Sequence, residues 1–181
     1  MDIDGDRGTP IVGVVGRGKT GKTTLLEKLI PELKSRGYRV ATIKRHAHPG
    51  LEFDLPGKDS WRHAQAGSDF AVIAAPDKVA SVRKLERELT LDEVSATITG
   101  VDIILTEGYK RAGKPKIEVV RAGRSSEPLC TAEELSAVVT DVDLDLPVPR
   151  FGLEDVHALA DLIEARFLAD LATGGTRSTH G

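Results

Sequence analysis

A glycine-rich stretch near the start of the chain, Gly16–Thr24 (GRGKTGKTT), constrains the fold more than any other. It fits the pattern G-x-x-x-x-G-K-[ST] of the phosphate-binding P-loop. The apolar, β-branched segment Ile11–Val15 precedes it and predicts a buried strand, and Leu25–Ile30 follows with apolar residues at helical spacing. Because strand, glycine loop and helix come in the order in which a P-loop works, we interpret the stretch as a nucleotide-phosphate site rather than a chance glycine loop.

The chemistry of this stretch assigns roles to its residues. Glycines let backbone N–H groups turn toward phosphate oxygens, and the N-terminus of the following helix adds the positive end of its dipole. We expect Lys22 to reach the β- and γ-phosphates as a catalytic residue and the Thr23 hydroxyl to ligate Mg²⁺. The residues expected to contact the nucleotide are Gly16, Gly18, Lys19, Thr20, Gly21, Lys22, Thr23 and Thr24.

Length and composition fit one globular domain. The chain has 181 residues, of which 40% are hydrophobic and 29% charged, so it can bury a substantial core. We expect a nucleotide-binding domain over residues 10–172, with disordered ends at 1–9 and 173–181. The net charge of −3 without a large basic block argues against a nucleic-acid partner. A single cysteine fits a reducing cytoplasm, and no apolar run approaches the roughly 18 residues of a membrane span.

The pattern along the chain predicts an α/β fold, namely a three-layer P-loop NTPase fold with a mainly parallel sheet. A helix over about Lys22–Ser35 should end at Gly37, and Tyr38–Ile43 should form the next strand of a βαβ unit. Further strands are expected at 70–75, 101–107, 116–121 and 136–141, with a closing helix at 153–164. Segment 79–82 could pair with 70–75 in a hairpin.

Two carboxylates flank the apolar strand 101–107, with Asp102 at its start and Glu107 at its end. Ligand sites lie at the carboxyl ends of parallel strands, so we expect Glu107 to hold Mg²⁺ or its water and to serve catalysis. Gly108 would then allow the backbone to approach a phosphate closely. By the same logic Asp141, which ends another apolar strand, could accept hydrogen bonds from guanine N1–H and N2–H₂. The chain has no Asn-Lys-x-Asp guanine motif.

The polar loop after the second predicted strand holds further candidate ligands. Asp54 is expected as a Mg²⁺ ligand, directly or through water. His46 and His48, with Glu52 and Asp54, could instead ligate a transition metal, although surface histidines near phosphates explain them as well. A basic run further on is either a solvated face or a contact for a second phosphate-bearing partner; it comprises Lys110, Arg111, Lys114 and Lys116.

Four blocks of this sequence together resemble one family, the molybdopterin-guanine dinucleotide biosynthesis adapter proteins (MobB). They are the P-loop with Leu25-Leu26, the segment Ile43–His48, the segment Asp54–Arg62 with Ala66-Gly67, and Leu105–Lys110 leading to Pro115–Glu118. The Pro-Gly-Lys-Asp-Ser and Glu-Gly-Tyr-Lys blocks are far more specific than the P-loop, and beyond Arg121 the likeness is thin.

The resemblance implies a P-loop protein that binds GTP with Mg²⁺ as a homodimer and hydrolyses GTP slowly. It also implies that the chain assists a guanylyltransferase, MobA, which makes the guanine dinucleotide form of the molybdenum cofactor; the chain is at most a weak GTPase and not that enzyme. Molybdopterin is a further candidate ligand. Carried over by position, Asp54 and Glu107 lie near the metal, and the residues facing nucleotide or pterin are Lys44, His46, Lys58 and Arg62.

The sequence departs from the family pattern at two places. Arg17 and Lys19 stand in a loop expected to be richer in serine and glycine, and Arg45 stands where a histidine is frequent. Arg17 could act across a dimer as an arginine finger. Other readings stay open from the residues alone: a metallochaperone GTPase using His46 and His48, a small-molecule P-loop kinase, or a binding module with a vestigial P-loop.

Overall fold

The computed structural model describes residues 8–48, 50, 55–125 and 127–169. These form two compact units: unit 1 contains the chain up to Arg45 and from Ser95 onward, and unit 2 contains His46–Val94. The sequence interpretation assigns residues 10–172 to one domain and does not separate these two units. Most of the two ends expected to be disordered, and residues 170–172, lie outside the described residues.

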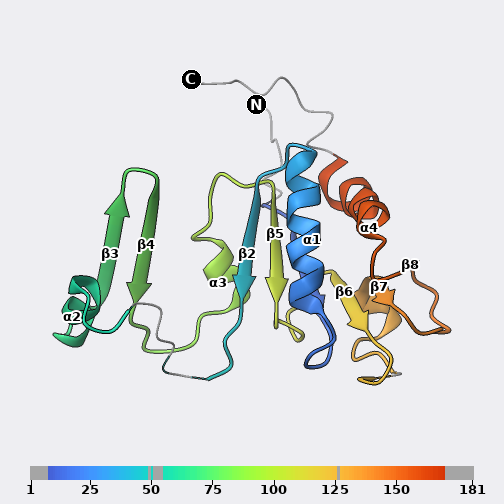
Figure 1. The fold of residues 1–181 in the computed structure, drawn as a ribbon, viewed down its shortest axis with the longest axis horizontal. Coiled ribbons are helices and arrows are strands. Elements are labelled where there is room, and N and C mark those ends of the chain that lie inside the picture. Colours follow the sequence, from blue (N-terminus) through green and yellow to red (C-terminus); the bar gives the residue numbers. More distant parts are fainter. Residues whose placement is uncertain (1–7, 49, 51–54, 126, 170–181) are drawn as a thin grey trace, which may run out of the picture. The chain divides into compact units, whose positions relative to one another are not determined.

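Unit 1 is built on a six-stranded parallel sheet, so the predicted mainly parallel α/β fold is confirmed (Figure 1). The strand order is β2-β5-β1-β6-β7-β8, which places the P-loop strand β1 in the interior of the sheet. The strands are β1 (Ile11–Val15), β2 (Val40–Lys44), β5 (Ile103–Glu107), β6 (Lys116–Val120), β7 (Leu135–Thr140) and β8 (Arg150–Phe151).

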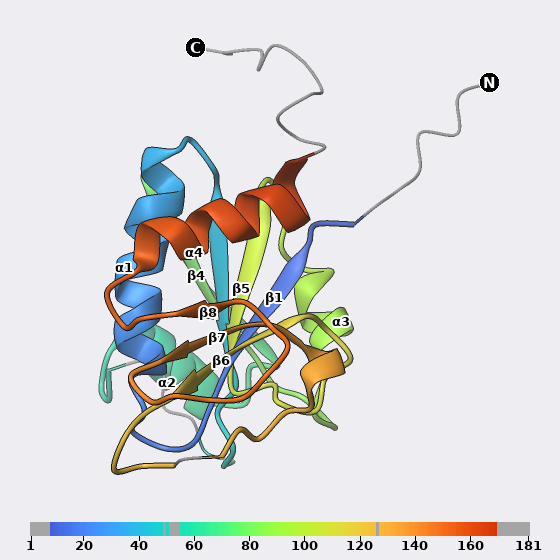
Figure 2. The ribbon, with the colours of Figure 1, turned by 90° about the vertical axis from the view of Figure 1, so that its right-hand side faces the viewer.

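Two helices cover one face of this sheet (Figure 2). They are α1 (Lys22–Ser35), whose bounds match the prediction, and α4 (Val156–Ile163), which continues into a π-helical turn, η2 (Glu164–Leu168). Leu29 and Leu33 of α1 are fully buried against Ile103 and Leu105 of β5 in the main core. Each such leucine stabilises the fold by about 2 kcal/mol. The helix ends at Ser35, and Gly37 two residues later adopts a φ of 89° and lets Tyr38 N–H donate to the Leu33 carbonyl.

A loop rather than a long helix packs on the opposite face of the sheet. Apolar residues alternate with acidic ones over 141–146, and the apolar ones contact a second core cluster that includes Val120, Cys130 and Val138. The short 3₁₀ helix η1 (Ala132–Glu134) begins with a capping box formed by Thr131 and Glu134 and leads directly into β7. Another short helix, α3 (Leu91–Ser95), includes the point in the sequence where unit 2 ends and unit 1 resumes.

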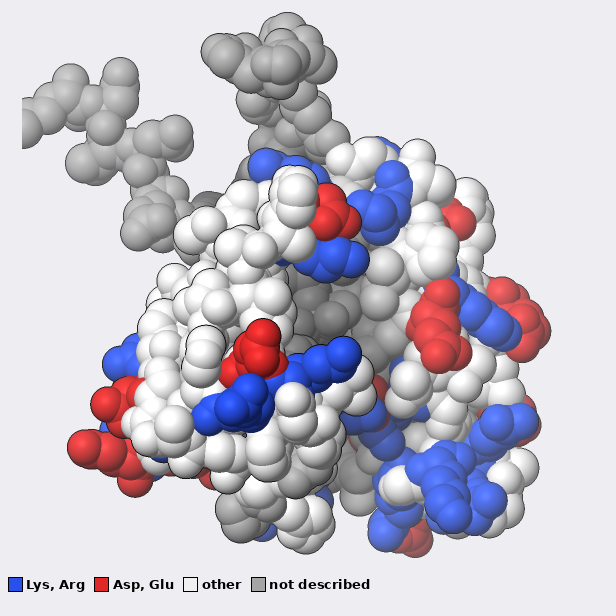
Figure 3. All heavy atoms as spheres, turned by 60° about the vertical axis from the view of Figure 1, so that its left-hand side comes forward, with Lys and Arg blue, Asp and Glu red and all other residues white. Residues whose placement is uncertain are grey.

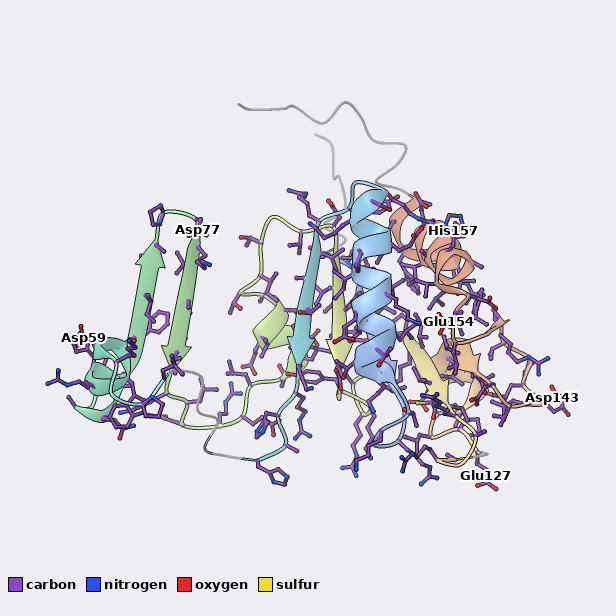
Figure 4. All side chains as sticks on the ribbon, in the orientation of Figure 1. Asp59, Asp77, Glu127, Asp143, Glu154 and His157 are labelled. Carbon is purple, nitrogen blue, oxygen red and sulfur yellow. The ribbon has the colours of Figure 1, made fainter. Side chains whose placement is uncertain are left out.

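Unit 2 consists of a short helix, α2 (Asp59–Gln65), and an antiparallel hairpin of β3 (Phe70–Ala75) and β4 (Lys78–Arg83). The hairpin suggested by the sequence is thus confirmed, and Figure 4 labels Asp77 in its turn and Asp59 at the start of α2. Among the described residues, β3 and β4 pair only with each other. Phe70, Val72 and Val79 of the hairpin are more than half exposed.

The parallel arrangement brings the ends of three strands to the P-loop edge of unit 1. Glu107 ends β5, Arg121 follows β6, and Asp141 follows β7. The P-loop itself follows β1, and β5 and β6 are the two neighbours of β1. Within the described part of the chain, none of the helices has the length and apolar character to cross a membrane.

Candidate functional site

The P-loop joins β1 to α1 in a conformation that its glycines make possible. Gly16 has a φ of 141°, and a Cβ there would lie 2.5 Å from the Val119 carbonyl oxygen of β6, so only glycine fits. Gly21, with a φ of 100°, is the N-cap of α1. Inside the loop, the buried Thr20 hydroxyl and the Lys22 ammonium both donate to the Arg17 carbonyl, at 3.0 and 2.8 Å. These bonds hold the loop in a tight turn above the helix N-terminus.

The loop presents a positive environment to solvent. Arg17, Gly18 and Lys19 are exposed, and Lys19 adopts a left-handed φ of 62°, which a lysine seldom takes. The first N–H groups of α1 lack intrahelical acceptors, so together with the cations they form an anion-binding end. In the view of Figure 3, Lys and Arg side chains gather densely at the lower right of the surface. The P-loop and the start of α1 suit a phosphate-bearing ligand.

Glu107 lies beside Thr23, as the sequence predicts. Its carboxylate oxygens accept from the Thr23 hydroxyl at 3.2 and 3.4 Å, and Lys44 Nζ of the adjacent strand lies 3.8 Å away. The carboxylate is largely shielded, with 14% of its side chain exposed. Asp102, the alternative acid, lies at the other end of β5, where it accepts from the Arg39 backbone and guanidinium at 2.7 and 2.8 Å. Its role is therefore structural.

Gly108, which follows Glu107, also has a left-handed φ, of 95°. A Cβ at this position would lie 3.3 Å from the Arg45 Cβ, and the Arg45 N–H donates to the Glu107 carbonyl at 2.9 Å. In the structure, the close approach that Gly108 permits is therefore to the chain leaving β2. This hydrogen bond holds the backbone that leaves β5 after Glu107 against the chain that leaves β2.

Asp141 lies at the carboxyl end of β7 and anchors the segment that follows β6. Its Oδ1 accepts the Ala122 N–H at 2.7 Å, and its Oδ2 lies 3.8 Å from Arg121 Nε. Beside it, a cavity of about 520 Å³ opens between the ends of β7 and β8, with Phe151 and Gly152 in its lining. Asp141 therefore combines an anchoring bond with a position at a cavity on the ligand-binding edge of the sheet.

Two residues that the sequence interpretation did not single out also lie beside the P-loop. Arg17 Nε donates to Ser125 Oγ at 3.0 Å, and a guanidinium nitrogen of Arg121 lies 3.9 Å from where a Gly21 Cβ would be. Arg121 could have been found from sequence, because it stands directly after a buried strand at the same edge as Glu107. Ser125 lies in a polar connecting segment, and nothing in the sequence pattern marks it as a neighbour of the P-loop.

Comparison with known proteins assigns the family. The family model described as molybdopterin guanine dinucleotide synthesis protein B matches residues 11–141. The chain belongs to this family. It is 37% identical over 158 residues to the molybdopterin-guanine dinucleotide biosynthesis adapter protein of Haemophilus influenzae, covering 86% of this chain and 88% of that one. Against the adapter protein of Escherichia coli K12 the identity is 37% over 160 residues, covering 85% and 91%.

Solved structures of MobB proteins share the fold. A crystal structure of molybdopterin-guanine biosynthesis protein B superposes with a TM-score of 0.69 at 31% identity, covering 87% of this chain and 99% of that one. The structure of Bacillus subtilis MobB gives a TM-score of 0.67 at 24% identity, covering 87% and 98%. The resemblance stated from the sequence motifs is thereby confirmed.

The remaining residues expected at the MobB site belong to unit 2 or lie outside the described part. Lys58 is the N-cap of α2 and Arg62 lies within that helix, 3.8 Å from Asp59; both are exposed. Asp54, the expected second metal-site acid, lies outside the described residues. The predictions for these residues therefore stand as predictions.

The histidine pair of unit 2 is the basis of the metallochaperone hypothesis. The rings of His46 and His48 lie edge to face with centroids 6.1 Å apart, and His46 Nδ1 lies 2.9 Å from the His48 carbonyl oxygen. Over the described residues, no group of three or more His, Cys, Asp or Glu side chains is placed to hold a metal ion. No contact in this part of the chain favours transition-metal binding.

Proposed function

We propose that this MobB-family chain is a GTP-binding adapter that serves a guanylyltransferase in making the molybdopterin guanine dinucleotide form of the molybdenum cofactor. One observation carries the proposal: in a chain of the MobB family, the P-loop residue Thr23 donates a hydrogen bond to the carboxylate of Glu107. The names of the relatives supply the pathway, because both the H. influenzae and the E. coli proteins are called adapters of this biosynthesis.

The residues of the site are chemically suited to bind Mg²⁺ and a nucleoside triphosphate. The Thr23 hydroxyl and the Glu107 carboxylate are hard oxygen donors 3.2 Å apart, which is the ligand type that Mg²⁺ prefers. Lys22, Lys19 and the N–H groups at the start of α1 would bind the phosphates. Bound Mg²⁺ would neutralise phosphate charge, while the protein fixes the position of the nucleotide. Selection of guanine would fall to Asp141, which lines the cavity between β7 and β8.

The hydrogen bonds that the side chains of the site already make support slow hydrolysis of GTP. Fast GTP hydrolysis needs one group that orients water and another that offsets charge in the transition state. Glu107 bonds Thr23, and Arg17 bonds Ser125 of the same chain. For Arg17 to act as a finger across a dimer, its bond to Ser125 would have to break. If Arg17→Ala leaves both the hydrolysis rate and GTP affinity unchanged, Arg17 has neither a catalytic nor a binding role.

The adapter acts, in this proposal, as a homodimer in the cytoplasm, with MobA as its partner. Lys44, His46, Lys58 and Arg62 would face the nucleotide or the pterin. A second copy of the chain would cover the apolar side chains of the β3–β4 hairpin, since a two-stranded hairpin with this much exposed apolar surface is marginally stable in water.

Reconstitution with a MobA-type guanylyltransferase, molybdopterin and Mg²⁺–GTP tests the adapter role. At limiting GTP, the chain should raise the rate at which the guanine dinucleotide forms. Lys22→Ala should abolish this effect, whereas Lys34→Ala, which removes an exposed lysine from the last turn of the same helix, should not. Equal rates with and without the chain would contradict the proposal.

A further inference from the structure

The segment after β6, described over residues 121–125 and 127–130 and here called the β6 segment, lies beside the P-loop at separate points. The P-loop starts against the end of β6, because Gly16 approaches the Val119 carbonyl. Arg17 Nε then bonds Ser125 Oγ at 3.0 Å, and Arg121 lies 3.9 Å from the Cβ position of Gly21. The end of β6 therefore borders the first glycine of the phosphate-binding loop, and the β6 segment borders the loop at Arg17 and at Gly21, where α1 begins.

The β6 segment is also held firmly in place. The Arg121 carbonyl accepts the N–H groups of Arg124 and Ser125, at 3.0 and 3.1 Å, which closes a tight turn. The carboxylate of Glu118, only 1% exposed, accepts the N–H groups of Leu129 and Cys130 at 2.6 and 3.0 Å. At the other end, Asp141 holds the Ala122 N–H. Figure 4 labels Glu127, which lies on this segment at the lower edge of the sheet.

The charge of Arg121 is positioned at the end of the P-loop where α1 begins. Half of its side chain is exposed, and its Nε lies 3.8 Å from Asp141 Oδ2, too far for a hydrogen bond. The ion pair thus orients the guanidinium without using its N–H donors on that carboxylate. Gly21 is the N-cap of α1, where N–H groups point at a bound anion, and a guanidinium there offers bidentate bonds to phosphate.

We propose that Arg121 is a phosphate-binding residue, donating to a phosphate oxygen of the nucleotide at the α1 end of the P-loop. This inference rests on the proposed nucleotide binding and adds a ligand contact from outside the P-loop motif. Such a contact explains why a buried carboxylate and a tight turn fix the backbone of a segment whose own side chains are largely exposed.

Titration calorimetry with two probes tests the proposal: Mg²⁺–GTP, and Mg²⁺ with inorganic triphosphate, which has no base. The loss of one hydrogen-bonded charge contact should weaken binding of both probes by about tenfold or more in Arg121→Ala. Arg124→Ala removes the same charge from the same turn and should change affinity little. Arg121→Lys should fall between, because lysine keeps the charge but loses the planar fork.

The possible outcomes separate the alternatives. A similar loss for both probes in Arg121→Ala, and not in Arg124→Ala, supports the phosphate contact. A loss confined to GTP would overturn it and move Arg121 to the base or ribose. An equal loss of affinity in Arg121→Ala and Arg124→Ala would mean that only the net charge matters, and this result would also overturn the proposed phosphate contact. If the unmodified chain binds neither probe, the proposed function itself fails, and this inference falls with it.

Discussion

Glu107 and Thr23 show how two residues distant in sequence become one chemical unit. Thr23 starts α1 and Glu107 ends β5, and the parallel pairing of β1 with β5 brings their oxygens to 3.2 Å. The sequence sufficed to predict this meeting, because a P-loop threonine and the acid at the end of a neighbouring parallel strand share one edge. It did not suffice for Ser125, since the Arg17–Ser125 bond joins residues 108 positions apart with no motif to connect them.

At this scale, we predict that Glu107→Gln removes the Mg²⁺ dependence of GTP binding. Glutamine keeps the shape and can still accept from Thr23, but it lacks the charge that holds a divalent cation. Affinity for GTP in the presence of Mg²⁺ should fall by about tenfold or more, or about 1.4 kcal/mol. Calorimetry at saturating and zero Mg²⁺ checks this, with Glu27→Gln on the exposed side of α1 as the control. An undiminished Mg²⁺ effect would show that Glu107 does not serve the metal.

At the scale of elements, an ion cluster ties the end of α1 to α4. Arg36 donates to Glu32, Asp161 and Glu164 at 2.9, 2.6 and 3.0 Å, and Tyr38 donates to Glu164 at 2.5 Å. His157, labelled in Figure 4, adds a 2.8 Å contact between its Nδ1 and Glu32. Arg36 lowers the pKa of Glu32 below its ordinary value of 4.5, and Tyr38 followed by Arg36 does the same for Glu164.

This cluster makes the stability of the α1–α4 contact depend on pH. Carboxylates with a lowered pKa stabilise the fold above pH 4.5, and that contribution is lost as the pH falls through the lowered values. Arg36, with 14% of its side chain exposed, should therefore matter most near neutral pH. We expect Arg36→Ala to reduce the free energy of unfolding by about 2 kcal/mol at pH 7.

Urea denaturation at pH 7 and pH 3 measures this prediction. The difference between the unmodified chain and Arg36→Ala should narrow at pH 3, because below pH 4.5 the carboxylates of the unfolded chain take up protons and the advantage of their lowered pKa in the fold diminishes. Lys34→Ala, an exposed change two residues away, should have little effect at either pH. A difference of the same size at both pH values would mean that Arg36 acts through packing rather than through the carboxylates.

At the scale of the whole molecule, the chain combines a nucleotide-binding unit with a small hairpin unit. Local patterns predicted the helix over Lys22–Ser35, the parallel strands and the hairpin, because each has a clear period or turn. They did not predict that His46–Val94 forms a unit of its own, nor that a loop with alternating Asp and apolar residues packs on one sheet face. Both features depend on contacts between segments distant in sequence, and the periodicity of a local segment does not predict such contacts.

The hairpin unit carries the prediction about assembly. If a second copy covers the apolar surface of β3 and β4, Val79→Asp should convert the dimer to a monomer, because Val79 is 70% exposed in the single chain and a charge there cannot be buried cheaply. Light scattering during gel filtration gives the mass directly. Gln65→Glu adds one negative charge at an exposed site of the same unit and should leave the dimer intact. A Val79→Asp dimer would place the interface elsewhere.

The central claim is that the P-loop of this chain binds Mg²⁺–GTP, and calorimetric titration with GTP and ATP, with and without Mg²⁺, tests it most directly. We predict that GTP binds more tightly than ATP, that Mg²⁺ strengthens binding, and that Lys22→Ala abolishes it while Lys34→Ala does not. Tighter binding of ATP would contradict the assignment of Asp141 to guanine and favour a kinase. Binding of neither nucleotide would contradict the claim itself.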